Sequence, residues 1–131
     1  MLRIMIVLIM LVLMFPPCSV GKEDVIIAVA SDGKTLKDSV SQLAARCPYF
    51  LFIDNTGKLL EAVDNPYAET RGGAGISAAY FLAERNVTIV VAGNFGNKMK
   101  DELNAQKITY FQFEGIVEEA IRKILEKEGR I

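Results

Sequence analysis

The stretch "RGGAGISAAYFLAERNVTIVVAGN", residues 71–94, decides the fold class. Apolar residues at helical spacing in "GISAAYFLAERN" (75–86) predict a helix that ends near Asn86. The β-branched run "VTIVVAG" (87–93) then predicts a buried strand. A helix leading directly into a buried strand is typical of an α/β protein.

The sequence on either side of this unit supplies the other elements of a sheet. The order is strand, hairpin, then alternating helices and strands, which predicts a five-stranded mixed sheet with flanking helices. The three residues Asn55, Thr56 and Gly57 form the hairpin turn. The expected strands are 24–31, 49–54, 58–64, 87–93 and 108–113, and the expected helices are 75–86, 97–106 and 115–128.

Apolar spacing also predicts which side chains are buried. The first helix should bury Ile76, Ala79, Leu82 and Ala83 on one face. The last helix repeats apolar pairs four residues apart, and Tyr49, Phe50 and Phe52 are expected in the core. The pairs are Ile116 with Val117, Ala120 with Ile121, and Ile124 with Leu125.

Composition limits both the architecture and the chemistry. The chain has 131 residues, of which 51% are hydrophobic, so residues 22–131 fit one globular domain. Fifteen basic and 16 acidic residues are spread along it, and this argues against nucleic acid as a partner. The complete absence of histidine removes the usual general base and the commonest metal ligand.

Residues 1–21 have the pattern of a secretory signal. A basic residue, Arg3, precedes an apolar stretch from Ile4 to Phe15, and small residues stand before an expected cleavage after Gly21. An uncleaved membrane anchor and a true start at Met14 are the alternatives. Export or anchoring is expected if this segment is genuine, and cleavage would remove Cys18 and leave a single cysteine, Cys47.

Three special loops follow strands whose carboxyl ends share one edge of the predicted sheet. They are "SDGK" (31–34), "AGNFG" (92–96) and "FEG" (113–115). Ligand sites of such sheets gather outside the carboxyl ends of the strands. Gly72, Gly73 and Gly75 either bare their N–H groups to an anion or serve a tight turn and close packing.

The phrases "ARCPYF" (45–50), "NPYAETRGGAGISAAYFLA" (65–83) and "VVAGNFGNKMKDEL" (90–103) resemble the dinitrogenase iron-molybdenum cofactor biosynthesis family. The resemblance covers roughly residues 25–125 and implies a ribonuclease H-like fold. It also implies a non-enzymatic domain that binds or carries iron-molybdenum or related metal-sulfur clusters, with a metallocofactor assembly or recipient protein as partner. If the start lies downstream, the family leads us to expect a cytoplasmic protein.

The resemblance also implies where a cluster would bind. The expected crevice combines Arg46 and Cys47 with two glycine loops, and Cys47 is the expected metal ligand. Turn geometry and helix packing are the alternative explanation of the loops, whose site residues are Gly72, Gly73, Gly75, Gly93, Asn94 and Gly96.

The ligand set departs from the family pattern at one position. Where relatives commonly have histidine this chain has Leu43, so Cys47 is the sole soft ligand of the mature domain. One thiolate is fewer than the four that hold a typical iron-sulfur cluster, so we expect transient rather than permanent binding. Arg46 beside it is expected to favour the thiolate, and the alternative is that Cys47 is a small buried hydrophobe.

Two other function classes compete with the carrier interpretation. Nucleases with the same fold hold metal ions between carboxylates, and Asp32 suggests such a site, but Asn94 stands where its partner is expected. A protein-interaction or scaffold domain that has lost its ligand is the stronger alternative, because the histidine is missing.

Overall fold

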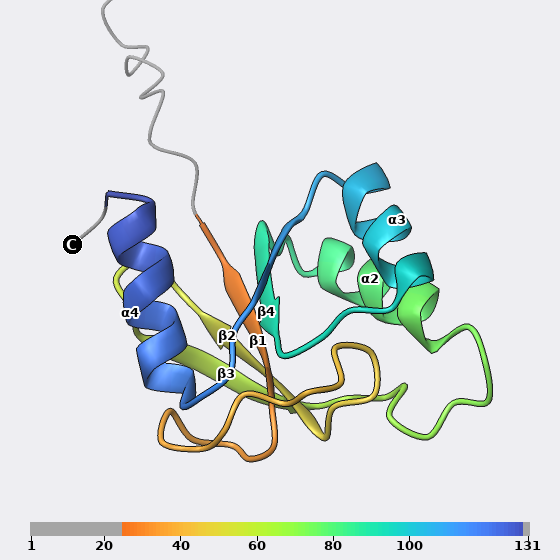
Figure 1. The fold of residues 1–131 in the computed structure, drawn as a ribbon, viewed down its shortest axis with the longest axis horizontal. Helices are drawn as coiled ribbons and strands as arrows, with labels where there is room; N and C mark the ends of the chain where they lie inside the picture. Colours follow the sequence, from red (N-terminus) through yellow and green to blue (C-terminus); the bar gives the residue numbers. More distant parts are fainter. Residues whose placement is uncertain (1–24, 130–131) are drawn as a thin grey trace, which may run out of the picture.

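The computed structural model describes residues 25–129, which form one sheet and three helices (Figure 1). The expected α/β class and the order of elements are confirmed. The strands are β1 (Ile27–Ser31), β2 (Tyr49–Ile53), β3 (Leu59–Asp64), β4 (Ile89–Ala92) and β5 (Thr109–Gln112). The helices are α2 (Ala74–Glu84), α3 (Asn97–Ala105) and α4 (Val117–Lys127).

The sheet is mixed, as the sequence predicts, in the order β3-β2-β1-β4-β5. β2 pairs antiparallel with both β1 and β3, whereas β1, β4 and β5 run parallel. All residues of β1 and β4 are buried, which explains why these two strands are continuous apolar runs. The carboxyl ends of the three parallel strands therefore meet at one edge.

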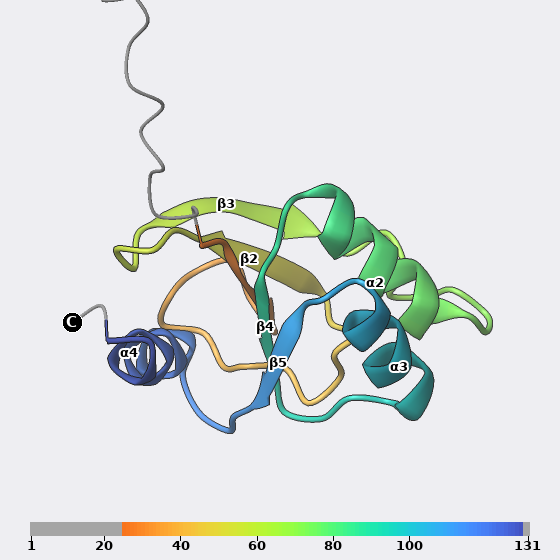
Figure 2. The same cartoon turned by 90° about the horizontal axis from the view of Figure 1, so that it is seen from above.

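Helices cover both faces of the sheet. Figure 2 shows α2 and α3 on one face and α4 on the other. One core cluster joins Phe50, Leu82 and Leu103 on the first face, and the other joins Leu51, Val91 and Ile124 on the second. Each strand thus alternates its side chains between two cores.

The buried face of α2 differs from the prediction at Ile76. Its side chain is 39% exposed, whereas Ala74, Ala78, Ala79 and Leu82 are buried. The small residues let α2 approach the sheet closely, so the buried face is centred on alanine rather than on the branched Ile76. In α4 the predicted pairs are buried except Ile116, which precedes the helix and is exposed.

The turns follow the local chemistry of the sequence. Gly57 has φ 92°, as expected for the hairpin, although the link between β2 and β3 spans residues 54–58 rather than three residues. Asn86 has φ 62° and follows the end of α2, as predicted. Phe50 and Phe52 are buried, whereas Tyr49 is only half-buried.

Candidate functional site

The segment 41–47 crosses the carboxyl edge of the sheet. The Ser41 N–H donates to the Ala30 carbonyl at 2.7 Å, and the Gly93 N–H donates to the Ser41 carbonyl at 2.8 Å. Farther along, the Ala44 N–H donates to the Asn94 carbonyl at 3.2 Å. These bonds fix the segment against the loop that follows β4.

The same segment is tied on its other side to the loop that precedes α2. Asn65 is buried, and its Nδ2 donates to the carbonyls of Ala45 at 2.8 Å and Cys47 at 2.9 Å. The Arg46 guanidinium donates to the Thr70 carbonyl. The structure thus brings the Arg46–Cys47 segment alongside both glycine loops.

Two helices begin side by side at these loops. Gly73 is the N-cap of α2 and Gly96 is the N-cap of α3; neither helix has a side-chain cap or an acidic residue in its first turn. A Cβ built on Gly75 would lie 3.1 Å from the Met99 Cβ and 3.3 Å from the Met99 nitrogen, so the first turns of the helices touch. Uncapped N–H groups of two adjacent helices create a region of positive potential.

The glycines of the site serve different purposes. A Cβ on Gly75 would lie tightly against Met99 of α3, whereas a Cβ on Gly93 would meet the Gln42 carboxamide at 2.7 Å, the end of an exposed side chain that can move aside. Gly72 and Gly73 have φ of 82° and 71°, a conformation that favours glycine, and their missing side chains would extend into open space. Helix packing therefore explains Gly75, backbone conformation accounts for Gly72 and Gly73, and neither requires glycine at position 93.

Gly96 is explained by neither reason. Its φ of −71° and ψ of 154° suit any residue, and a Cβ there would meet nothing within 4 Å. A residue with a polar side chain at this N-cap position would satisfy an N–H group of α3. Glycine instead leaves these N–H groups open.

Cys47 lies in the core beneath this edge. Its side chain is fully buried, its Sγ lies 3.8 Å from the Ala44 carbonyl oxygen, and the Asn65 Nδ2 lies 3.7 Å from the Sγ. Burial raises the pKa of the Cys47 thiol to about 12. The expectation that Arg46 favours the thiolate is wrong for this conformation, because the guanidinium is directed to the Thr70 carbonyl.

The remaining predicted positions lie at the surface of the same edge. Leu43, where relatives have histidine, is 57% exposed and forms a β-bridge with Asn94. The Asn94 Oδ1 accepts hydrogen bonds from the Phe95 N–H at 2.9 Å and from the Gln112 Nε2 at 3.3 Å. Among residues 25–129, no group of three or more cysteine, aspartate or glutamate side chains is placed to hold a metal ion.

Asn65 is the residue that sequence reasoning missed. Its Oδ1 accepts the Tyr67 N–H at 3.0 Å, a local turn that its place before Pro66 signals. Its bonds to the Arg46–Cys47 segment span about 20 positions of sequence, and no local pattern predicts them.

Comparisons with known proteins agree with this architecture. Residues 25–127 match the family model described as dinitrogenase iron-molybdenum cofactor. No curated protein matches the chain. In the part of the chain that the structure describes, no helix has the length and apolar character needed to span a membrane.

Solved structures share the fold. The apo form of the orange protein from Desulfovibrio gigas is 32% identical with a TM-score of 0.72, covering 80% of this chain and 88% of that one. A proposed NifB protein from Thermotoga is also 32% identical, with a TM-score of 0.66 and coverage of 81% and 90%. A proposed dinitrogenase from Methanocaldococcus jannaschii, 17% identical with a TM-score of 0.58 and coverage of 82% and 93%, shares the fold alone.

Proposed function

The chain belongs to the dinitrogenase iron-molybdenum cofactor family, and we propose on this premise that its domain carries a metal-sulfur cluster and catalyses no reaction. The cargo is an anionic iron-molybdenum, molybdenum-sulfur or iron-sulfur species, bound transiently. The partner is a protein that assembles such a cluster or receives it.

The observation that carries this proposal is the pair of uncapped helix N-termini. Anions bind at helix N-termini because free N–H groups point at them and the helix dipole attracts negative charge. In this chain α2 and α3 present two such ends in contact, with the open glycine Gly96 at one and Gly72 and Gly73 at the other. An anionic cluster meets donors from both helices.

The residues around these helix ends have different roles in the proposed site. Gly72, Gly73 and Gly96 leave their surroundings open for the cluster, and the exposed Arg46 supplies a positive charge beside them. Gly75 allows the first turns of the two helices to pack closely, and Gly93 leaves the space that the exposed Gln42 carboxamide occupies. Asn94 anchors the Leu43–Ala44 segment through its main chain and completes the border of the site.

Cys47 has a conditional role in this proposal. A bond from its sulfur to a metal requires the 41–47 segment to open and the thiol to lose its proton, and burial opposes both changes. Hydrogen bonds therefore hold the cluster first, and the thiolate bond forms only after the segment opens. Binding is weak, because Leu43 replaces the histidine expected from the resemblance.

Anaerobic titration of the full chain with tetrathiomolybdate tests the carrier function. We expect saturation at about one anion per chain. The visible absorbance of the bound tetrathiomolybdate should be lost on desalting, because a weakly bound anion dissociates when the free anion is removed. Absence of binding would contradict the proposal, and a colour that survives gel filtration would contradict the weak ligand set.

The Cys47→Ser variant separates ligation from packing. If Cys47 ligates the cargo, the affinity for tetrathiomolybdate falls sharply; if the residue only packs, the affinity stays and only the free energy of unfolding changes. Neither result tests the helix ends, which a substitution at Gly96 tests separately.

A scaffold function is the second candidate, and the exposed Leu43 favours it. A leucine that is 57% exposed at the edge of the site presents apolar surface to a partner rather than a ligand to a metal. In this case tetrathiomolybdate does not bind, and Leu43→Ser weakens capture of a partner protein without changing the thermal midpoint.

The export prediction concerns residues outside the described range. We propose cleavage after Gly21, and the intact mass of the native protein tests it. A chain that begins at Lys22 supports the proposal, and a chain that begins at Met14 contradicts it.

A further inference from the structure

The strand β5 is an open edge of the sheet, with β4 on one side only. The N–H groups of Thr109 and Phe113 donate to carbonyls on the β4 side, of Thr88 and Ala92. Because residues alternate along a strand, the N–H and C=O groups of Tyr110 and Gln112 point outward. Figure 2 shows this edge between α4 and α3.

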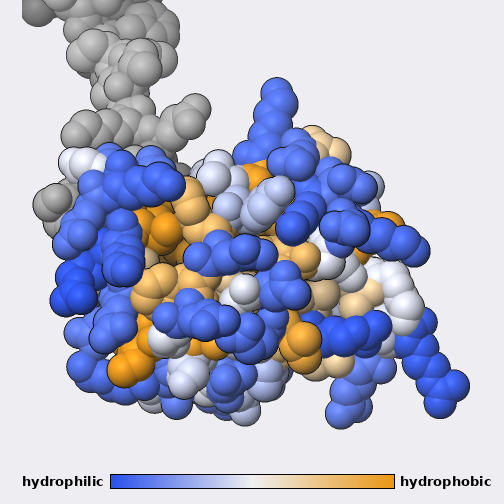
Figure 3. All heavy atoms as spheres, in the orientation of Figure 1, coloured by the Kyte–Doolittle hydropathy of each residue, from blue (hydrophilic) through white to orange (hydrophobic). Residues whose placement is uncertain are grey.

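Lysines surround this edge. The Lys127 Nζ lies 4.6 Å from the centre of the Phe111 ring, and the Lys123 Nζ lies 5.4 Å from that of Phe113. Lys107 stands just before the strand and is exposed. None of these three lysines forms an ion pair with another residue in the range 25–129. Figure 3 shows apolar surface between hydrophilic side chains on the face seen in Figure 1.

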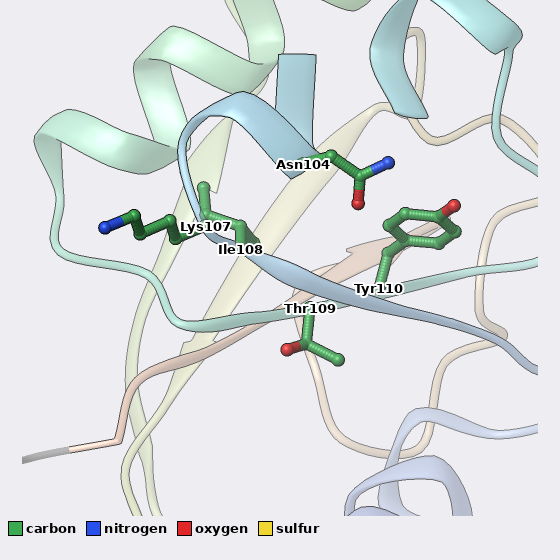
Figure 4. A pocket seen from close by; sticks show the side chains of 5 residues that line it. All are labelled: Asn104, Lys107, Ile108, Thr109 and Tyr110. Atoms are coloured by element: carbon green, nitrogen blue, oxygen red, sulfur yellow. The ribbon is translucent and has the colours of Figure 1, made fainter. Parts of the chain in front are cut away.

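A hollow lies at the beginning of the same strand. It has a volume of about 510 Å³ and is lined by Asn104, Lys107, Ile108, Thr109 and Tyr110. In Figure 4 the Asn104 amide and the Tyr110 ring lie on the same side of the strand. The hollow can accept a side chain of a segment that runs along β5.

We propose that the β5 edge, defined as Lys107–Phe113 with Lys123 and Lys127, binds an extended acidic segment of a partner protein as an added strand. The outward groups of Tyr110 and Gln112 supply main-chain hydrogen bonds, and the three lysines select negative charge. This surface borders the loop that follows β4, since the Gln112 Nε2 donates to the Asn94 Oδ1 and Phe95 packs on Tyr110, but it uses none of the glycines. The proposal therefore stands whether or not the domain carries a cluster.

The lysines also argue against a second copy as occupant. Suppose that the β5 strands of two copies paired antiparallel and hydrogen-bonded the outward N–H and C=O groups of Tyr110 and Gln112. Tyr110 of each copy would then face Gln112 of the other, and Phe111 would lie on the two-fold axis. Lys127 lies over the Phe111 ring, so this arrangement brings two like charges together. An acidic segment meets attraction at the same place.

The test uses a fluorescent octapeptide of alternating glutamate and valine with the full chain. We expect binding by anisotropy, and amide exchange at Tyr110 and Gln112 slowed by about tenfold or more at saturation. The amides of Thr109 and Phe113, already bonded toward β4, serve as internal controls. A peptide with lysine in place of glutamate should not bind, and proline in place of a central valine should abolish the protection.

The matched variants are Lys123→Glu/Lys127→Glu and Lys34→Glu/Lys58→Glu, which change the net charge equally. The first should weaken binding by about tenfold and the second should change it far less. Equal binding of the proline peptide, or binding without protection of Tyr110 and Gln112, would overturn strand addition. Protection that grows with protein concentration in the absence of peptide would identify a second copy as the occupant and also overturn the proposal.

Discussion

The helix N-termini of this domain differ in how their free N–H groups are satisfied. At α4, the N–H groups of Val117 and Glu118 donate to the carbonyls of Asp38 and Leu36, both at 2.9 Å, and two glutamates occupy the first turn. At α2 and α3 the first turns have neither acidic residues nor side-chain caps. One helix end is thus satisfied by the chain itself, whereas the other two have no such partners among the residues that the structure describes.

The loops beside these helix ends are held differently too. Main-chain hydrogen bonds fix the loop at α4, including the one from the Val40 N–H to the Gly115 carbonyl at 2.8 Å. At α2 and α3, the Asn65 side chain alone holds the carbonyls of Ala45 and Cys47. The candidate site thus combines the main-chain bonds of segment 41–47 with those of one buried side chain, whereas the α4 end is held by main-chain bonds.

Asn65→Ala should have the largest effect on stability. It removes three hydrogen bonds of a buried side chain and leaves their partners unsatisfied, at a cost of about 3 kcal/mol in the free energy of unfolding. Urea denaturation measures it. Asn104→Ala, at an exposed asparagine, is the control and should change little. Equal losses for the two variants would break the comparison.

Gly75→Leu should separate the two open helix ends. The side chain collides with Met99, and the overpacking costs about 2 kcal/mol after the gain in helix propensity. Gly96→Leu is the matched control: a Cβ there meets nothing, so the variant should lose only the preference for glycine over leucine at an N-cap, less than about 1 kcal/mol. If Gly96→Leu destabilises the domain as much as Gly75→Leu, the conclusion that packing requires glycine at position 75 but not at position 96 is wrong.

The sequence predicts the framework well because the framework depends on local periodicity. Apolar runs predict β1 and β4, the spacing of α4 predicts its buried stripe, and Gly57 signals the hairpin. Ile76 shows the limit of this kind of prediction. Helical spacing identifies an apolar face of α2, but the position of the sheet determines which residues of that face are buried. The site is less predictable, since the need for a small residue at Gly75 depends on Met99, a distant neighbour that no local pattern reveals.

The burial of Cys47 makes the free energy of unfolding depend on pH. Because the pKa of the folded thiol is raised to about 12 from an ordinary 9.0, its stabilising contribution is complete below pH 9.0 and is lost as the pH rises toward 12. The loss approaches about 1.4 kcal/mol per pH unit within this window. Urea denaturation of the wild type and Cys47→Ala between pH 8 and pH 11 measures it, and parallel curves would show that the thiol is accessible.

Gly96→Asp tests the central claim, that the ends of α2 and α3 are left open for an anion. The backbone at Gly96 suits an N-cap, so an aspartate there caps α3 and raises the free energy of unfolding by a few tenths of a kcal/mol at most. The same carboxylate occupies the free N–H groups and repels the ligand.

The direct measurement is the affinity of Gly96→Asp for tetrathiomolybdate, with Asn55→Asp, in the β2–β3 turn at the opposite edge of the sheet, as a control of equal charge. We predict an affinity lowered by about tenfold or more in Gly96→Asp and nearly unchanged in Asn55→Asp, with both proteins folded. Unchanged affinity in a well-folded Gly96→Asp would contradict the account.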